Sequence, residues 1–201
     1  MLTRIEELEA IYGEPKARSV AKEISYISEA YGAFITASPF VILASAGSDG
    51  LDCSPKGDPA GFVRIIDAHT LAIPDRPGNN RIDTLRNLLQ DPRVGLLFLV
   101  PGVGEMMRVN GRASISDDPA LLASFSVDGK PPRTVIVIQV ESVYFHCSKA
   151  LVRSDLWNQD KHVDRATLPS AGAMLQNVSD PNFDVDAYDR ELRRRLKTEL
   201  Y

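Results

Sequence analysis

Side chains able to bind a charged ligand are concentrated in one stretch of the chain, between Cys53 and Arg81. Its polar residues and glycines are Ser54, Lys56, Gly57, Asp58, Arg76, Gly78, Asn79, Asn80 and Arg81. Cations and hydroxyls attract oxyanions, and glycines let a ligand come close to the backbone. Two apolar runs in the stretch, Gly61–Ile66 and Thr70–Ile73, are typical of strands. The stretch therefore predicts a phosphate-bearing ligand that lies across strand ends.

The segment Arg76–Arg81 stands at the head of a predicted helix, with Asn80 as the expected N-cap. Backbone N–H groups at a helix N-terminus attract anions, and two guanidinium groups can each form paired hydrogen bonds with phosphate oxygens. The same residues also fit a capped strand-to-helix turn with solvated arginines. On these residues alone the two interpretations are about equally supported, and the GxxxxGK[ST] pattern of a phosphate-binding loop is absent.

A second group, Ser54-Pro55-Lys56-Gly57-Asp58, places a hydroxyl, a cation and an unhindered backbone on one strand. Taken by themselves these residues favour an ordinary strand end with a turn at Asp58-Pro59. A third group, Lys149–Trp157, holds the only tryptophan of the chain beside two cations. Its flat ring could cover a cofactor, or it could equally anchor the core or a subunit interface.

Composition limits the classes of function. The chain has 201 residues, a net charge of -4 and a pI of about 5.4, so a broad electrostatic grip on nucleic acid or an anionic membrane is not expected. No apolar run approaches a membrane span and the first residues lack a signal-peptide core, which predicts a cytoplasmic protein. Cys53 and Cys147 show no spacing typical of a disulfide framework or zinc site.

The elements that must position these residues are mostly strands. Apolar or alternating runs predict strands at 40–46, 51–56, 61–66, 70–73, 94–100, 106–115 and 134–147, with a bulge at Gly111. Residues 51–73 are expected to form a meander, and helices are expected at 5–12, 15–27, 28–38, 80–90, 119–126 and 184–200. Six or seven antiparallel strands with short hairpins favour a small barrel closed on itself.

The run from Phe40 to Ser116 closely resembles the pyridoxamine 5′-phosphate oxidase-like, FMN-binding split-barrel family. The elements SPKGD, DRPGNNR and KALxRSxLW together resemble an uncharacterised bacterial branch of it. The resemblance implies a mainly β protein with peripheral helices (α+β), built on a six-stranded antiparallel split β-barrel. It also implies one domain over 1–201, with a helical extension at 1–38, the barrel at 39–147, and an interface segment at 148–201.

The resemblance implies a homodimer with FMN at the subunit interface. Asn80 and Arg81 would grip the phosphate with Arg76 nearby, and Lys149, Arg153, Ser154 and Trp157 would come from the other subunit. The segments flanking the ring and ribityl chain would be Ser54, Pro55, Lys56, Gly57 and Asp58 on one strand and Ile73, Pro74 and Asp75 on another. Metal ligands are not implied.

Two departures separate the chain from the vitamin-forming oxidases. Their Ser-Arg-Lys phosphate tract is replaced by Asn80-Arg81-Ile82, and their C-terminal Arg-Leu…Pro ending is absent. We therefore expect an FMN-dependent oxidoreductase acting on a small organic substrate or an electron carrier rather than on pyridoxamine phosphate, with redox potential biased by Lys56 or Lys149. The alternatives are a non-catalytic flavin or haem sensor and a deazaflavin-dependent reductase on the same barrel.

Overall fold

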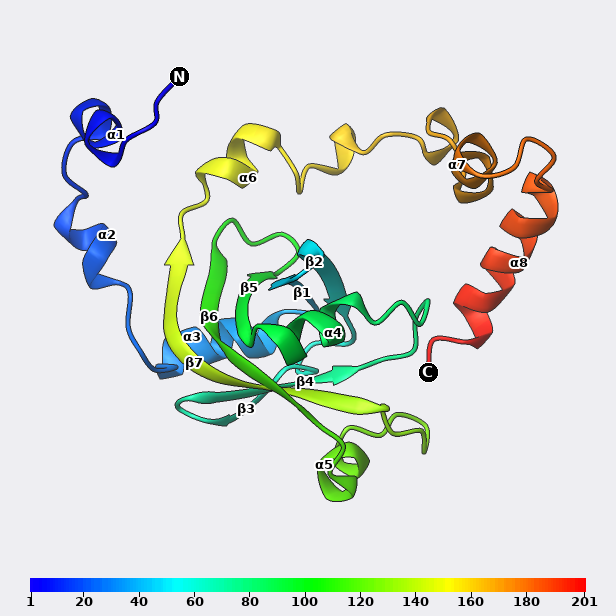
Figure 1. Cartoon of the computed structure of the whole chain (residues 1–201), viewed down its shortest axis with the longest axis horizontal. Helices are drawn as coiled ribbons and strands as arrows, with labels where there is room; N and C mark the ends of the chain where they lie inside the picture. Colours follow the sequence, from blue (N-terminus) through cyan, green and yellow to red (C-terminus); the bar gives the residue numbers. More distant parts are fainter.

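Seven antiparallel strands form one sheet in the computed structural model, which describes residues 1–201 (Figure 1). The strands are β1 (Phe40–Gly47), β2 (Gly50–Gly57), β3 (Arg64–Asp67), β4 (Thr70–Asp75), β5 (Arg93–Leu99), β6 (Met106–Ser116) and β7 (Thr134–His146). Their order across the sheet is β2-β1-β5-β6-β7-β4-β3. The predicted antiparallel fold is confirmed: the seven strands correspond to the seven predicted runs, whereas the family resemblance implied six.

Two long strands, β6 and β7, join the two halves of the sheet. The first part of β6 pairs with β5, from Leu99↔Met106 to Arg93↔Arg112, while the first part of β7 pairs with β4. The register between β6 and β7 shifts at Asn110/Gly111, which confirms the predicted bulge. A Cβ on Gly111 would lie 2.1 Å from the Gln139 carbonyl oxygen, so the close approach of the backbones requires glycine.

Strand alternation places the core inside the curved sheet. Val41 and Leu43 of β1 and Leu96 and Phe98 of β5 point inward and are buried, as is almost all of β4. Burying these apolar side chains supplies the main stabilising term of the barrel. Helix α3 (Glu29–Ala37), which begins at the Ser28 cap, adds the fully buried Ile35 to the same core.

The sheet does not close on itself by hydrogen bonds. Strands β2 and β3 each pair with one neighbour only and stand at opposite edges. The expected meander through residues 51–73 is therefore wrong for the pairing of β2 with β3, while the antiparallel pairing of β3 with β4 is confirmed. Residues 58–63 connect the two edges of the sheet, since β2 pairs with β1 and β3 pairs with β4 in a local hairpin. The barrel is therefore split between β2 and the β3–β4 hairpin.

Some helices pack on the barrel, and others lie away from it. Helix α4 (Asp83–Gln90) packs on β1 with Leu88 buried, α5 (Pro119–Ser124) follows an Asp118 cap, and α6 (Lys149–Ser154) follows β7. The remaining elements are α1 (Ile5–Tyr12), α2 (Ala17–Ala21), α7 (Ala171–Val178), α8 (Val185–Thr198) and two 3₁₀ turns, Gln159–Lys161 and Arg165–Thr167. In Figure 1 α1, α2, α7 and α8 extend beyond the sheet on two sides.

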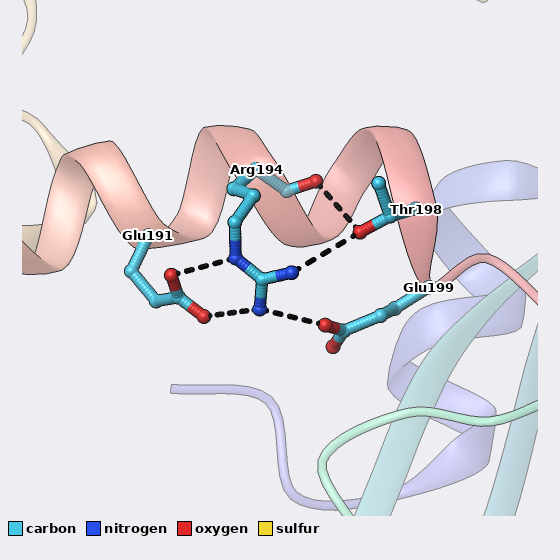
Figure 2. A network of polar contacts seen from close by, with 4 residues as sticks. All are labelled: Glu191, Arg194, Thr198 and Glu199. Carbon is cyan, nitrogen blue, oxygen red and sulfur yellow. Dashed lines mark hydrogen bonds and ion pairs between the residues drawn. The ribbon is translucent and has the colours of Figure 1, made fainter.

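One helix prediction was wrong at its C-terminal end. The helix expected over 15–27 ends at Ala21, because Ile24 forms a β-bridge with Val143 and Ile27 enters the core. The basic residues of α8 are exposed, and Arg194 contacts Glu191 at 2.6 Å and Glu199 at 2.8 Å (Figure 2). These carboxylates raise the pKa of Arg194, although exposed pairs of this kind contribute little to stability.

No helix of the chain is both long and apolar enough to cross a membrane.

Candidate functional site

A polar cavity of about 550 Å³ opens at the split of the barrel, a size typical of small-molecule sites. Strand β2, the end of β4, the loop before α4, the first turn of α4 and the start of β7 all contribute to its wall. The lining residues are Asp52, Ser54, Lys56, Asp75, Arg76, Pro77, Gly78, Asn79, Asn80, Arg81, Ile82, Asp83, Thr84, Leu85, Arg133 and Thr134. The structure thus brings together the two halves of the stretch that the sequence singled out.

An ion pair crosses the split between β2 and β4. Lys56 Nζ lies 2.8 Å from Asp75 Oδ1, and both side chains are about one-fifth exposed. Since these strands share no backbone hydrogen bonds, the pair links edges that the sheet leaves separate. A neighbouring hollow of about 380 Å³ runs along the same edge and is lined by Pro55, Gly57 and Pro74 among others.

The loop before α4 presents an uncapped helix N-terminus to the cavity. Asn80 and Ile82 both have left-handed backbones, with φ of 58° and 53°, and Ile82 rather than Asn80 is the N-cap. No side chain accepts from the first N–H groups of α4. The predicted capping role of Asn80 is therefore wrong, because α4 begins at Asp83 and Asn80 lies two residues before the N-cap. Free N–H groups at this position suit an anion.

Arg81 reaches into solvent at the mouth of the cavity. Its Nε donates to Asp83 Oδ2 at 2.7 Å, and this bond and the charge of Asp83 raise the pKa of the guanidinium. The backbone N–H of Arg81 donates to Asn79 Oδ1 at 3.0 Å, which fixes the turn. Nη1 and Nη2 of Arg81 make no bond within the protein and remain able to donate to a ligand.

Arg76 and Asp58 form a second ion pair, at 2.7 Å, near the same split. Arg76 also donates to the Phe125 carbonyl at 3.0 Å, and Tyr201 donates to the other oxygen of Asp58. Only 4 % of the Asp58 side chain and 16 % of the Arg76 side chain are exposed. The charge of Arg76 is thus already paired with Asp58, and two of its five N–H donors are used, so the arginine shapes the cavity wall more than it offers an unpaired cation.

Four further residues, which the sequence did not single out, complete the cavity. Arg133 Nη1 donates to Asn80 Oδ1 at 3.2 Å, which brings another guanidinium to the loop. The Thr134 hydroxyl is buried without a hydrogen-bond partner. Asp52 accepts from Thr84 at 2.6 Å and from Ser54 at 2.9 Å, which ties α4 to β2. An orphaned buried hydroxyl beside two arginines fits a ligand with several acceptor oxygens.

The remaining predicted residues lie elsewhere in the chain. Ile73 is fully buried in the barrel core, so its side chain does not face the cavity. Lys149, Arg153, Ser154 and Trp157 do not line the cavity of their own chain. Trp157 Nε1 donates to the Val103 carbonyl at 2.8 Å, which holds the segment after α6 against the turn between β5 and β6.

The fold and cavity together define an antiparallel split barrel with a polar site at its opening. The sequence model of the family described as pyridoxamine 5′-phosphate oxidase matches residues 27–147, more than half of the chain. The chain therefore belongs to the pyridoxamine 5′-phosphate oxidase-like family. The match includes every strand, while α1, α2 and the segment after Cys147 lie outside it.

Several solved structures are similar to the chain at low sequence identity. HupZ of Group A Streptococcus is 18% identical over 58% of this chain and 91% of its own, with a TM-score of 0.48. A candidate pyridoxamine 5′-phosphate oxidase of Lactobacillus delbrueckii is 19% identical over 60% and 95%, with a TM-score of 0.46. A FAD-binding protein of Mesorhizobium loti is 18% identical over 60% and 94%, with a TM-score of 0.42. No curated protein matches the sequence.

Proposed function

We propose that the protein is a homodimeric FMN-dependent oxidoreductase that acts on a small organic substrate or an electron carrier. The observation that carries the proposal is the cavity at the split, where an uncapped helix N-terminus, Arg81, Arg133 and the unpartnered Thr134 hydroxyl converge. These groups suit the phosphate of a flavin mononucleotide. Membership of the family is the second support.

The chain's residues divide into a phosphate end and a ring end. Arg81 and Asn80 would hold the phosphate, since Arg81 keeps free N–H groups at the cavity mouth. Strand β2 has one unpaired edge, whose backbone groups from Ser54 to Asp58 could hydrogen-bond the polar rim of the ring. Gly57 leaves room for this approach, and Pro74 forms the opposite wall of the adjoining hollow.

FMN would supply the electron transfer, and the protein would supply orientation and electrostatics. Lys56 beside the ring would favour negative charge on it, although Asp75 at 2.8 Å partly offsets this cation. No side chain at the cavity is required as a nucleophile. The placement of α6 away from its own cavity supports a second subunit, whose Lys149, Arg153, Ser154 and Trp157 would complete the ring end.

The visible spectrum of the purified protein tests the cofactor. A flavin band that is released as FMN on denaturation is expected. A Soret band would instead indicate a haem binder, and a colourless protein that fails to bind added FMN at micromolar concentration would reject the proposal. A reductant and oxidant screen, followed as bleaching and recovery of the flavin band, then separates a catalyst from a passive binder.

The phosphate grip has its own test. Arg81→Ala should weaken FMN binding about tenfold or more, because charge-assisted hydrogen bonds to the phosphate are lost. Riboflavin, which lacks the phosphate, should bind both proteins alike. Arg195→Ala, an exposed arginine of α8, serves as the matched control. Unchanged FMN affinity in Arg81→Ala would reject the assigned role, and sedimentation of the FMN-loaded protein as a monomer would reject the contribution of a second subunit.

A further inference from the structure

We propose that Lys22, Arg108 and Tyr144 form a second anion-binding site, which takes a small molecule through a carboxylate or phosphate group. The site lies at the far end of β6 and β7 and shares no residue with the cavity at the split. It does not depend on the proposed flavin. Donors of two cations lie near one phenol there, and neither cation has an ion-pair partner.

Two cations lie close to the Tyr144 ring. Arg108 and Tyr144 are direct partners in the β6–β7 register, and Arg108 Nη1 donates to the Tyr144 hydroxyl at 3.0 Å. Lys22 Nζ lies 5.8 Å from the Tyr144 ring centroid and donates to the Phe145 carbonyl at 2.6 Å. Both side chains keep further N–H groups that make no bond within the protein.

The backbone that carries Lys22 is fixed against the sheet. The Tyr31 hydroxyl donates to the Lys22 carbonyl at 2.7 Å, and Ile24 exchanges two backbone hydrogen bonds with Val143 at 3.1 and 2.8 Å. Figure 1 shows the segment after α2 running beside β7. Because the two cations are held by separate, ordered elements, their approach to one ring does not arise from a flexible side chain alone.

No carboxylate neutralises the pair. Neither Lys22 nor Arg108 takes part in any of the seven ion pairs of the chain, although the chain as a whole is acidic. Burial, Arg108 and Lys22 all lower the pKa of His146, whose ring centroid is 5.3 Å from that of Tyr144. Its Nε2 is buried without a partner. Like charges held together without compensation favour a bound anion.

The donors define the class of ligand. Arg108 offers its remaining guanidinium N–H groups, Lys22 its ammonium, and Tyr144 an O–H that donates to no protein atom. Each of these three side chains offers at least one free donor, and two of them are cations, so the complementary group carries at least two acceptor oxygens and a negative charge. Carboxylate and phosphate both satisfy this requirement, and the experiment separates them.

Calorimetric titrations of the full chain at low ionic strength test the site, with inorganic phosphate in one arm and acetate in the other. They are made in the Arg81→Ala background, so that the cavity at the split contributes little. Measurable binding of at least one probe is expected. Arg108→Gln should then weaken that binding about tenfold, and Tyr144→Phe several-fold, because each removes a donor. Lys197→Gln, an exposed cation of α8, should leave it unchanged.

Binding that survives Arg108→Gln, or that falls equally in Lys197→Gln, would overturn the proposal, as would the absence of binding by both probes. If Arg108→Gln does not fold, Lys22→Gln and Tyr144→Phe provide the same comparison. Restoring Arg81 identifies anion binding at the split, because that binding responds to Arg81 and not to Arg108. Failure of the flavin proposal would leave these titrations unaffected.

Discussion

The Tyr201 hydroxyl donates a hydrogen bond to Asp58 Oδ1 at 2.5 Å, although the two residues are 143 positions apart. The other oxygen of Asp58 accepts from Arg76, whose guanidinium carbon lies 5.2 Å from the Tyr201 ring centroid. Tyr201, three residues beyond the end of α8, is thereby attached to the split beside the candidate cavity. This contact couples the stability of the C-terminal segment to the wall that Arg76 forms.

Removing this hydroxyl should destabilise the fold. Tyr201→Phe leaves one oxygen of a buried carboxylate without its donor, so we expect the free energy of unfolding to fall by about 1 kcal/mol. Urea unfolding of the two proteins measures the change. Tyr26→Phe removes an exposed hydroxyl that makes no hydrogen bond and is the matched control. Equal stability of Tyr201→Phe and wild type would show that the contact contributes nothing.

The same bond predicts a pH dependence. Its interaction with Asp58 raises the pKa of Tyr201 above the ordinary value of 10.0. A group whose pKa is raised on folding stabilises the protein below its unfolded pKa and loses that contribution as pH rises through the folded value. The stability difference between wild type and Tyr201→Phe should therefore be constant near neutral pH and shrink above pH 10. A difference that grows in this range would contradict the assignment.

Local sequence patterns predicted most elements of the barrel. Alternating or continuous apolar runs identified β1, β5, β6 and β7 to within a residue or two. These features depend on neighbours within a few positions. The order of the strands depends on long-range pairing instead. The placement of β2 and β3 at opposite edges results from such pairing, which no local pattern records.

The candidate site was predicted in part for the same reason. Lys56, Arg76 and Arg81 lie in one polar stretch and were found from composition. Arg133 was missed because an isolated arginine before a strand carries no signal until the fold brings it to Asn80. The left-handed backbone at Asn80 also escaped prediction, since a cap and a left-handed turn both favour asparagine.

The bulge between β6 and β7 provides a second stability test. Gly111→Ala would place a Cβ 2.1 Å from the Gln139 carbonyl oxygen, a backbone atom that cannot move aside. We expect a loss of about 3 kcal/mol or more in the free energy of unfolding. Gly95→Ala in β5, where the nearest atom would be 3.6 Å away, should change it by less than about 1 kcal/mol. Similar losses in both variants would contradict a specific backbone clash.

Acid should weaken the contact between Asp91 and Arg93. The Arg93 guanidinium and its backbone N–H lower the pKa of Asp91 from 3.8 to about 2. A carboxyl group with a lowered pKa stabilises the fold above its unfolded pKa, and this contribution is lost as pH falls through the folded value. The stability advantage of wild type over Asp91→Asn should therefore decrease between pH 3.8 and about 2. Asp117→Asn, at an exposed residue without an ion pair, is the control in urea unfolding at each pH.

Variants of Arg133 distinguish two roles at the proposed phosphate end: direct contact with the phosphate and positioning of the loop. Its Nη1 donates to Asn80 Oδ1 at 3.2 Å, so it could hold the loop, bind phosphate directly, or do both. We expect Arg133→Gln to weaken FMN binding several-fold, less than Arg81→Ala, with riboflavin binding unchanged. If Arg133 acts only through Asn80, the double variant with Asn80→Ala loses no more affinity than Asn80→Ala alone. An additional loss in the double variant would indicate a direct contact with the phosphate, and unchanged affinity in every variant would remove Arg133 from the site.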